Sequence, residues 1–176
     1  TALRLPKKKA NLTKWKQFVG KVKSAKKEVV IGVVGKYFST GDFVLSDAYV
    51  SVIEAIKFSA YWQGLKPKLV WLQADDKALL LKLKNVDGIL VPGGFGETGI
   101  EGKIKAIQFA RENKIPYFGL CYGMQLLVIE YARHVAKIKG AHTAEIEPES
   151  EHLVIDIMEH QKKLLAEGRY GASMRL

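Results

Sequence analysis

The chain has 176 residues, 48% of them apolar, and a formal net charge of +10. This length suffices for one hydrophobic core, and no apolar run reaches the roughly 18 residues of a membrane-spanning helix. We expect no secretory signal, because the basic residues 1–27 contain no apolar core. The single cysteine excludes an internal disulfide and makes the cytoplasm the expected compartment.

The excess positive charge belongs to the first segment. Residues 1–27 contain ten Lys or Arg and no acid, whereas residues 28–176 contain 18 residues of each sign. Four apolar residues recur in this segment at helical spacing: Leu12, Trp15, Val19 and Val22. The spacing predicts an amphipathic helix over 11–23 with a basic outer face, and so short a helix needs a partner to bury Trp15 and Phe18. An arm that binds RNA or an anionic membrane is the alternative.

From residue 28 on, strand and helix patterns alternate without a break in composition. Short apolar runs predict strands at 29–34, 68–73, 88–91 and 117–120. Longer periodic segments predict helices at 46–62, 100–113 and 122–136. Ser46 or Asp47 is the expected cap of the first of these helices. The alternation indicates the α/β class, with a flavodoxin-like, doubly wound and mostly parallel sheet. Residues from 153 on are expected to add strands and loops.

A glycine loop, residues 92–96 (Pro-Gly-Gly-Phe-Gly), directly follows the third expected strand. The carboxyl ends of parallel strands meet at one edge of a sheet, where ligands collect, so this loop should lie beside the end of the fourth strand. Residues 94–99 match the dinucleotide-binding pattern G-x-G-x-x-G. That motif needs a second strand that ends in an acidic residue about 20 residues later to bind the ribose, and the sequence has none there. Residues 32–36 likewise lack the glycine spacing of a phosphate loop. We therefore favour an oxyanion loop at 92–96.

Cys121 lies in residues 119–123 (Gly-Leu-Cys-Tyr-Gly), between the fourth expected strand and a helix. The spacing is typical of a nucleophile elbow, because the tight turn leaves room only for glycine beside the nucleophile. The start of the helix favours the thiolate, which is the form that attacks carbon. An amide of the glycine loop and the amide of Tyr122 could hold the oxyanion, which predicts acyl transfer. The alternative is a buried structural cysteine.

Seven segments, taken in order and spacing, resemble the class I glutamine amidotransferase domain of the CTP synthase family. They are residues 29–37, 47–55, 87–96, 102–108, 110–115, 121–125 and 131–135. The resemblance implies that Cys121 hydrolyses L-glutamine and that ammonia passes to a synthetase domain, which uses Mg-ATP to aminate UTP to CTP. Residues 1–27 would be the connector to that domain, and residues 28–176 the amidotransferase domain.

The resemblance has further implications for ligands and partners. It implies no cofactor or metal for this domain itself, and GTP as an allosteric effector. It also implies a homo-oligomer, a tetramer, formed through the synthetase domain, with neither nucleic acid nor membrane as a partner. Another class I amidotransferase, or a flavodoxin-like domain that only binds or regulates, is the competing hypothesis.

The resemblance also assigns substrate contacts. It places Gly94 at the oxyanion hole and in contact with glutamine. The pocket wall would be formed by the four residues after the nucleophile: Tyr122, Gly123, Met124 and Gln125. Glu145 would accept charge-assisted hydrogen bonds from the ammonium of the substrate. Three more glutamates follow within six residues, a pattern that is also typical of a solvated loop.

Three departures from the family pattern stand out. Tyr122 replaces the usual leucine, and Thr98 replaces an arginine that is tied to activation by GTP. The catalytic His-x-Glu pair of the family lies beyond its Met-Arg-Leu strand, which here is residues 174–176, so we expect an incomplete domain that is inactive alone. His134 follows Cys121 by 13 residues on a helix, about 20 Å away. The other histidines, His142, His152 and His160, are expected in polar surface segments.

Overall fold

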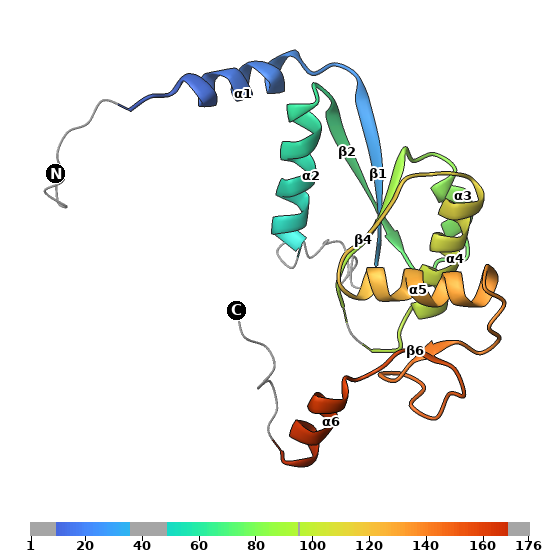
Figure 1. Ribbon diagram of the computed structural model, residues 1–176. Coiled ribbons are helices and arrows are strands. Elements are labelled where there is room, and N and C mark those ends of the chain that lie inside the picture. Colours follow the sequence, from blue (N-terminus) through green and yellow to red (C-terminus); the bar gives the residue numbers. More distant parts are fainter. Residues whose placement is uncertain (1–9, 36–48, 95, 169–176) are drawn as a thin grey trace, which may run out of the picture.

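The computed structural model describes residues 10–35, 49–94 and 96–168 (Figure 1). They form a four-stranded parallel sheet, helices on both of its faces, and a small two-stranded sheet. No helix in these ranges is long and apolar enough to cross a membrane. The expected α/β class with a parallel sheet is therefore confirmed.

The main sheet has the strand order β2-β1-β3-β4. Its strands are β1 (Glu28–Gly35), β2 (Lys66–Gln73), β3 (Gly88–Val91) and β4 (Tyr117–Gly119), and every neighbouring pair is parallel. Val91 pairs with Gly119, so β3 and β4 end at the same level. The two loops that follow them therefore begin side by side.

The two faces of the sheet are covered by different helices (Figure 1). One face carries α2 (Val50–Trp62), and the other carries α3 (Leu79–Leu83), α4 (Ile100–Glu112) and α5 (Tyr122–His134). The core of the second face consists of fully buried side chains from β3 and from the helices: Val91, Leu83, Ile104, Ile107, Leu126 and Ile129. We call this second side the covered face and the side under α2 the open face.

The expected elements differ from the observed ones mainly at their ends. The helix α5 stops at His134, two residues before the expected Ala136, because Lys137 adopts a left-handed φ of 60° that turns the chain away. The expected caps of α2, Ser46 and Asp47, lie outside the described residues. The short helix α3 was not expected, because a single turn carries too little periodicity to be recognised.

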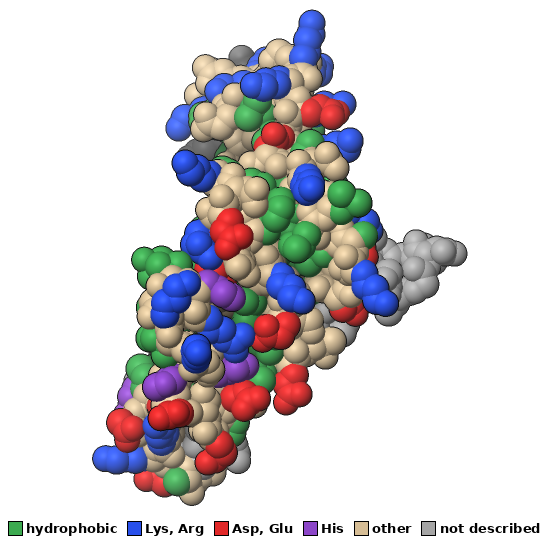
Figure 2. Space-filling view, turned by 90° about the vertical axis from the view of Figure 1, so that its right-hand side faces the viewer, with side chains coloured by type: hydrophobic (Ala, Val, Ile, Leu, Met, Phe, Trp, Pro, Cys, Tyr) green, Lys and Arg blue, Asp and Glu red, His purple; other side chains and the backbone are tan. Residues whose placement is uncertain are grey.

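The first helix, α1 (Thr13–Ser24), finds part of its apolar partner within the chain. The ring of Phe18 stacks on Phe58 of α2 at 4.7 Å between centroids and lies 6.3 Å from Trp62. The partner that this helix was expected to need is therefore supplied in part by α2 of the same chain. Trp15 nevertheless stays 63% exposed, and Lys and Arg side chains surround the α1 end of the molecule (Figure 2).

The segment after α5 contains more structure than expected. The strands β5 (His142–Thr143) and β6 (Leu153–Ile155) form a parallel pair, and α6 (Glu159–Ala166) is a helix where loops and strands were expected. The Nζ of Lys162 lies 3.2 Å from Glu159, one turn earlier, and 2.9 Å from Asp156. The pair of Glu159 and Lys162, three residues apart, supports a short helix, and this spacing was the signal that apolar periodicity missed.

Candidate active site

Cys121 occupies the turn between β4 and α5 with φ 50° and ψ −107°. Residues other than glycine seldom adopt a positive φ, and such strained positions cluster at functional sites. The side chain is exposed, and the residue is the N-cap of α5. The structure therefore presents the sulfur at the carboxyl edge of the sheet, where the nucleophile elbow was expected.

The glycines on either side of Cys121 explain how the turn fits. A Cβ added to Gly119 would lie 2.5 Å from the carbonyl carbon of Gly123, and one added to Gly123 would overlap the carbonyl oxygen of Val91. The start of α5 thus rests directly on the ends of β3 and β4. The hydroxyl of Tyr117 also donates a hydrogen bond to the carbonyl of Gly123 at 2.8 Å. These backbone contacts hold the nucleophile in one place.

The glycine loop after β3 lies beside the nucleophile. A Cβ added to Gly93 would lie 3.4 Å from the Cβ of Cys121 and 4.0 Å from its sulfur. Apart from its two chain neighbours, no heavy atom of the described residues lies within 4 Å of the corresponding position on Gly94, so this side of Gly94 faces open space. The sequence analysis assigned a role to Gly94 and missed that a side chain at Gly93 would touch Cys121. The two consecutive glycines were the available signal for that close approach.

Glu145 reaches the same loop from a distant part of the chain. Its Oε1 accepts a hydrogen bond from the backbone N–H of Gly96 at 3.1 Å, and the hydroxyl of Tyr122 donates to the carbonyl of Gly96 at 3.4 Å. Burial, together with the carboxylates of Glu145 and Glu97, raises the pKa of Tyr122 to about 12. The structure thus brings Glu145, Tyr122 and the glycine loop together.

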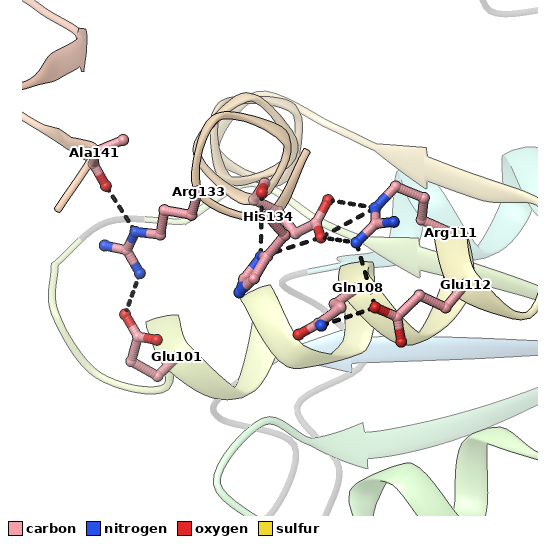
Figure 3. A network of polar contacts seen from close by, with 8 residues as sticks. Glu101, Gln108, Arg111, Glu112, Arg133, His134 and Ala141 are labelled. Atoms are coloured by element: carbon pink, nitrogen blue, oxygen red, sulfur yellow. Dashed lines mark hydrogen bonds and ion pairs between the residues drawn. The ribbon is translucent and has the colours of Figure 1, made fainter. Parts of the chain in front are cut away.

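The position of Glu145 depends on the chain that leads into it. The Nε of Arg133, on α5, donates to the carbonyl of Ala141 at 2.7 Å, and its Nη1 donates to Glu101 of α4 at 2.8 Å (Figure 3). The buried Thr143 accepts a hydrogen bond from the N–H of Glu145 at 3.3 Å. This set of contacts was not foreseen, because no pattern in the sequence links an arginine on one helix to a carbonyl eight residues later.

The remaining expected pocket residues lie on the first turn of α5. Tyr122 and Gly123 are buried, Gln125 is half-buried, and Met124 is exposed beside the exposed nucleophile. A pocket of 480 Å³ lies between the start of α4 and the β5 loop, and acidic residues line it: Asp75, Glu97, Glu101 and Glu147. In the described ranges, no cluster of three or more side chains is arranged to hold a metal ion.

The histidines make their contacts elsewhere. His134 lies at the far end of α5, with its Nδ1 3.2 Å from Oε1 and from the carbonyl of Glu130. The Nδ1 of His142 accepts a hydrogen bond from the N–H of Thr143 at 3.0 Å. His152 and His160 are exposed. Within the part of the chain that the structure describes, none of the four is hydrogen-bonded to Cys121.

Comparison with known proteins identifies the family of the chain that contains this elbow. The family model described as "Glutamine amidotransferase class-I" matches residues 44–170. The chain belongs to the class-I glutamine amidotransferase family. The elbow with Cys121 and the glycine loop lie within the matched range.

Curated relatives of this amidotransferase include CTP synthases. The protein from Sulfurisphaera tokodaii is 46% identical over 178 residues, and the one from Caldanaerobacter subterraneus subsp. tengcongensis is 48% identical over 177 residues. Each match covers 99% of this chain and 32% of the relative, so the chain spans about a third of the length of these relatives.

A solved structure shares the fold of this amidotransferase. The glutaminase domain of Trypanosoma brucei CTPS with bound acivicin superposes with a TM-score of 0.67 and 36% sequence identity. The match covers 75% of this chain and 51% of that chain. The resemblance seen in the sequence is thereby confirmed, both for the family and for the fold.

Proposed function

We propose that this chain is the glutamine-hydrolysing part of a CTP synthase and that Cys121 is its nucleophile. The observation that supports the proposal most directly is the strained elbow at Cys121, with Gly93 so close that an added Cβ would touch its side chain. Nucleophile elbows hold their residue in this way, so that the reactive atom stands free of the sheet while backbone amides surround it.

The chemistry that follows is acyl transfer in two steps. The thiolate attacks the carboxamide carbon of glutamine, and the amides of Gly94 and Tyr122 stabilise the oxyanion that forms. The carbon–nitrogen bond then breaks, the nitrogen takes a proton, and ammonia leaves behind a thioester on Cys121. Water attacks the thioester, releases glutamate and restores the thiol. The proton donor and base would be the His-x-Glu pair that the sequence resemblance places beyond residue 176.

Substrate selection is assigned to Glu145 and to the wall of the pocket. A carboxylate next to the glycine loop can accept hydrogen bonds from the ammonium of an amino acid, and Glu145 already accepts one there from Gly96. The T. brucei domain was solved with bound acivicin, which supports a small-molecule site in a domain of this fold. Met124 and Gln125, on the first turn of α5, would complete the wall.

The proposal extends to the other domain of the enzyme and to its assembly. Residues 1–27 would connect this domain to a synthetase domain that binds Mg-ATP and aminates UTP, and the enzyme would assemble as a tetramer through that domain. The exposed aromatic side chains of α1 and α2 and the surrounding lysines suit the connector role. The cytoplasmic compartment expected from the single cysteine remains a prediction.

The test of the proposal uses the full-length enzyme. Cys121→Ala should abolish glutamine-dependent formation of CTP and leave formation from added ammonia largely intact, because the amination chemistry resides in the other domain. Both activities are measured by the appearance of CTP. Equal loss of the two would mean that Cys121 is structural, which would refute its role as the nucleophile.

The proposal also covers activation of the enzyme by GTP. With Thr98 in place of the usual arginine and Glu97 beside it, the glycine loop lacks a cation that could respond to a phosphate. We expect weak activation by GTP in this enzyme and stronger activation in Thr98→Arg. Glutamine-dependent CTP formation measured against GTP concentration tests this. Strong activation that Thr98→Arg leaves unchanged would assign the coupling to another residue.

A further inference from the structure

The peptide groups around Gly96 are held on both sides by side chains. The N–H of Gly96 is bound by the carboxylate of Glu145 at 3.1 Å, and its carbonyl is bound by the hydroxyl of Tyr122 at 3.4 Å. Gly96 has a φ of 75°, which a residue with a side chain would adopt only under strain. Two side chains from outside the glycine loop therefore hold the peptide groups of Gly96.

Tyr122 is well suited to provide one of these contacts. It is the first residue of α5, directly after Cys121, and it is 1% exposed. Its ring belongs to the buried cluster that includes Ile100 and Ile104 of α4, and the Nζ of Lys103 lies 5.5 Å from the ring centroid. A pKa of about 12 keeps the hydroxyl protonated at neutral pH, so it stays a hydrogen-bond donor.

We propose that the hydroxyl of Tyr122 is a positioning group that holds the glycine loop in register with the nucleophile. This inference rests on the proposed glutamine hydrolysis. The backbone amide of Tyr122 would be one oxyanion donor, and its side chain would hold the loop that carries the other donor, Gly94. One residue thereby fixes the spacing between the two donors. The leucine usual in the family at this position has no hydroxyl, so the device belongs to this chain.

The effect should fall on kcat and not on KM. Oxyanion donors stabilise charge that develops only in the transition state, so their misplacement slows the reaction without weakening the binding of the substrate. Removal of a whole donor lowers kcat by about 10² to 10³. Loosening the loop keeps both donors present, so we expect a smaller fall, about 3- to 10-fold.

The experiment compares two phenylalanine variants of the full-length enzyme. Tyr122→Phe removes the hydroxyl and keeps the ring, while Tyr131→Phe makes the same change at an exposed tyrosine on the same helix. We expect Tyr122→Phe to lower kcat for glutamine hydrolysis about 3- to 10-fold with KM changed less than about twofold. Ammonia-dependent CTP formation should stay unchanged in both variants, and Tyr131→Phe should match the wild type throughout.

Alkylation of Cys121 by iodoacetamide provides a second readout. This reaction needs the thiolate but no oxyanion donor, so Tyr122→Phe should react at the wild-type rate. An unchanged kcat in Tyr122→Phe, or a loss shared by the ammonia-dependent activity, would overturn the positioning role. A wild-type enzyme that does not hydrolyse glutamine would instead overturn the proposed function, and the inference with it.

Discussion

Helices bury the two faces of the main sheet to different extents. On the covered face, three helices bury the sheet, and even a charged side chain, Glu130, is 0% exposed. On the open face, α2 is the single covering helix among the described residues, and only Ile53 and Ala60 of that helix are buried. An apolar hollow of 320 Å³ lies between α2 and β4, and Phe118 of β4 is 61% exposed.

The difference shows which side carries the site. Cys121 caps a helix of the covered face, and Arg133 on that same helix binds the carbonyl of Ala141, four residues before Glu145. The backbone contacts that fix the turn at Cys121 therefore involve α5 and the strand ends, while on the open face the neighbouring Leu120 packs in the cluster under α2. We infer that substitutions on the covered face should disturb both folding and the site, whereas those on the open face should be tolerated.

The largest electrostatic effect is expected at the ion pair between α4 and α5. The Nε and Nη2 of Arg111 donate to Glu130 at 2.8 to 3.1 Å, and Glu130 is fully buried. Arg111→Met leaves that carboxylate without its main cation, which should lower the free energy of unfolding by about 3 kcal/mol, the low end for a broken buried pair, because Arg111 is partly exposed.

Urea unfolding measures this loss, and a double variant provides the control. Arg111→Met combined with Glu130→Gln removes the unpaired charge, so it should be more stable than Arg111→Met alone. A loss below about 1 kcal/mol in the single variant would show that Glu130 is not dependent on Arg111 and would weaken the contrast between the faces.

A somewhat smaller effect is expected where α5 meets the sheet. In Gly123→Ala the new methyl group would overlap the carbonyl oxygen of Val91, so the helix start must shift. Overpacking of this kind lowers stability by about 1 to 3 kcal/mol. The shift also moves the nucleophile, so glutamine hydrolysis should fall more than stability alone explains. Thermal unfolding and glutaminase rates of the same preparation test both parts. Gly20→Ala, at an unobstructed glycine inside α1, is the control for stability.

The open face should respond less. Phe58 is 56% exposed and its main contact is the stack with Phe18 at 4.7 Å. Because an aromatic pair contributes about 0.5 to 1.5 kcal/mol, Phe58→Ala should lower the free energy of unfolding by about 1 kcal/mol. Ile129→Ala, on the covered face, should lower it by about 2 to 5 kcal/mol. Similar losses for the two variants, measured by urea unfolding, would remove the distinction between the faces.

The smallest effect concerns alkaline pH. Tyr122 has a pKa of about 12 in the folded chain against an ordinary value of 10.0, and burial also raises the pKa of Tyr117. The folded state therefore holds these protons more tightly, and the stability they contribute is complete below pH 10 and declines as the pH rises toward 12. Tyr122→Phe should make that decline shallower in urea unfolding between pH 9 and about 12. An unaltered slope would mean that the Tyr122 hydroxyl is not buried in solution.

Sequence patterns anticipated the parts of this structure that depend on local spacing. The four parallel strands, α4, α5 and the elbow around Cys121 follow from apolar periodicity and from glycines at fixed offsets. The contact between Glu145 and Gly96 joins residues 49 positions apart, and that between Phe18 and α2 joins residues 40 apart. Such contacts depend on how the elements pack, which periodicity does not encode. Resemblance to a family, and not spacing, drew attention to Glu145.

The φ of 50° at Cys121 has a consequence for how this chain can change over generations. A glycine at residue 121 would adopt that backbone shape without the roughly 1 to 3 kcal/mol that a strained residue costs. Mutation of residue 121 to glycine would therefore raise the stability of the fold. A thiol persists there only while its chemistry is needed, so its retention in a lineage is itself a record of selection for catalysis.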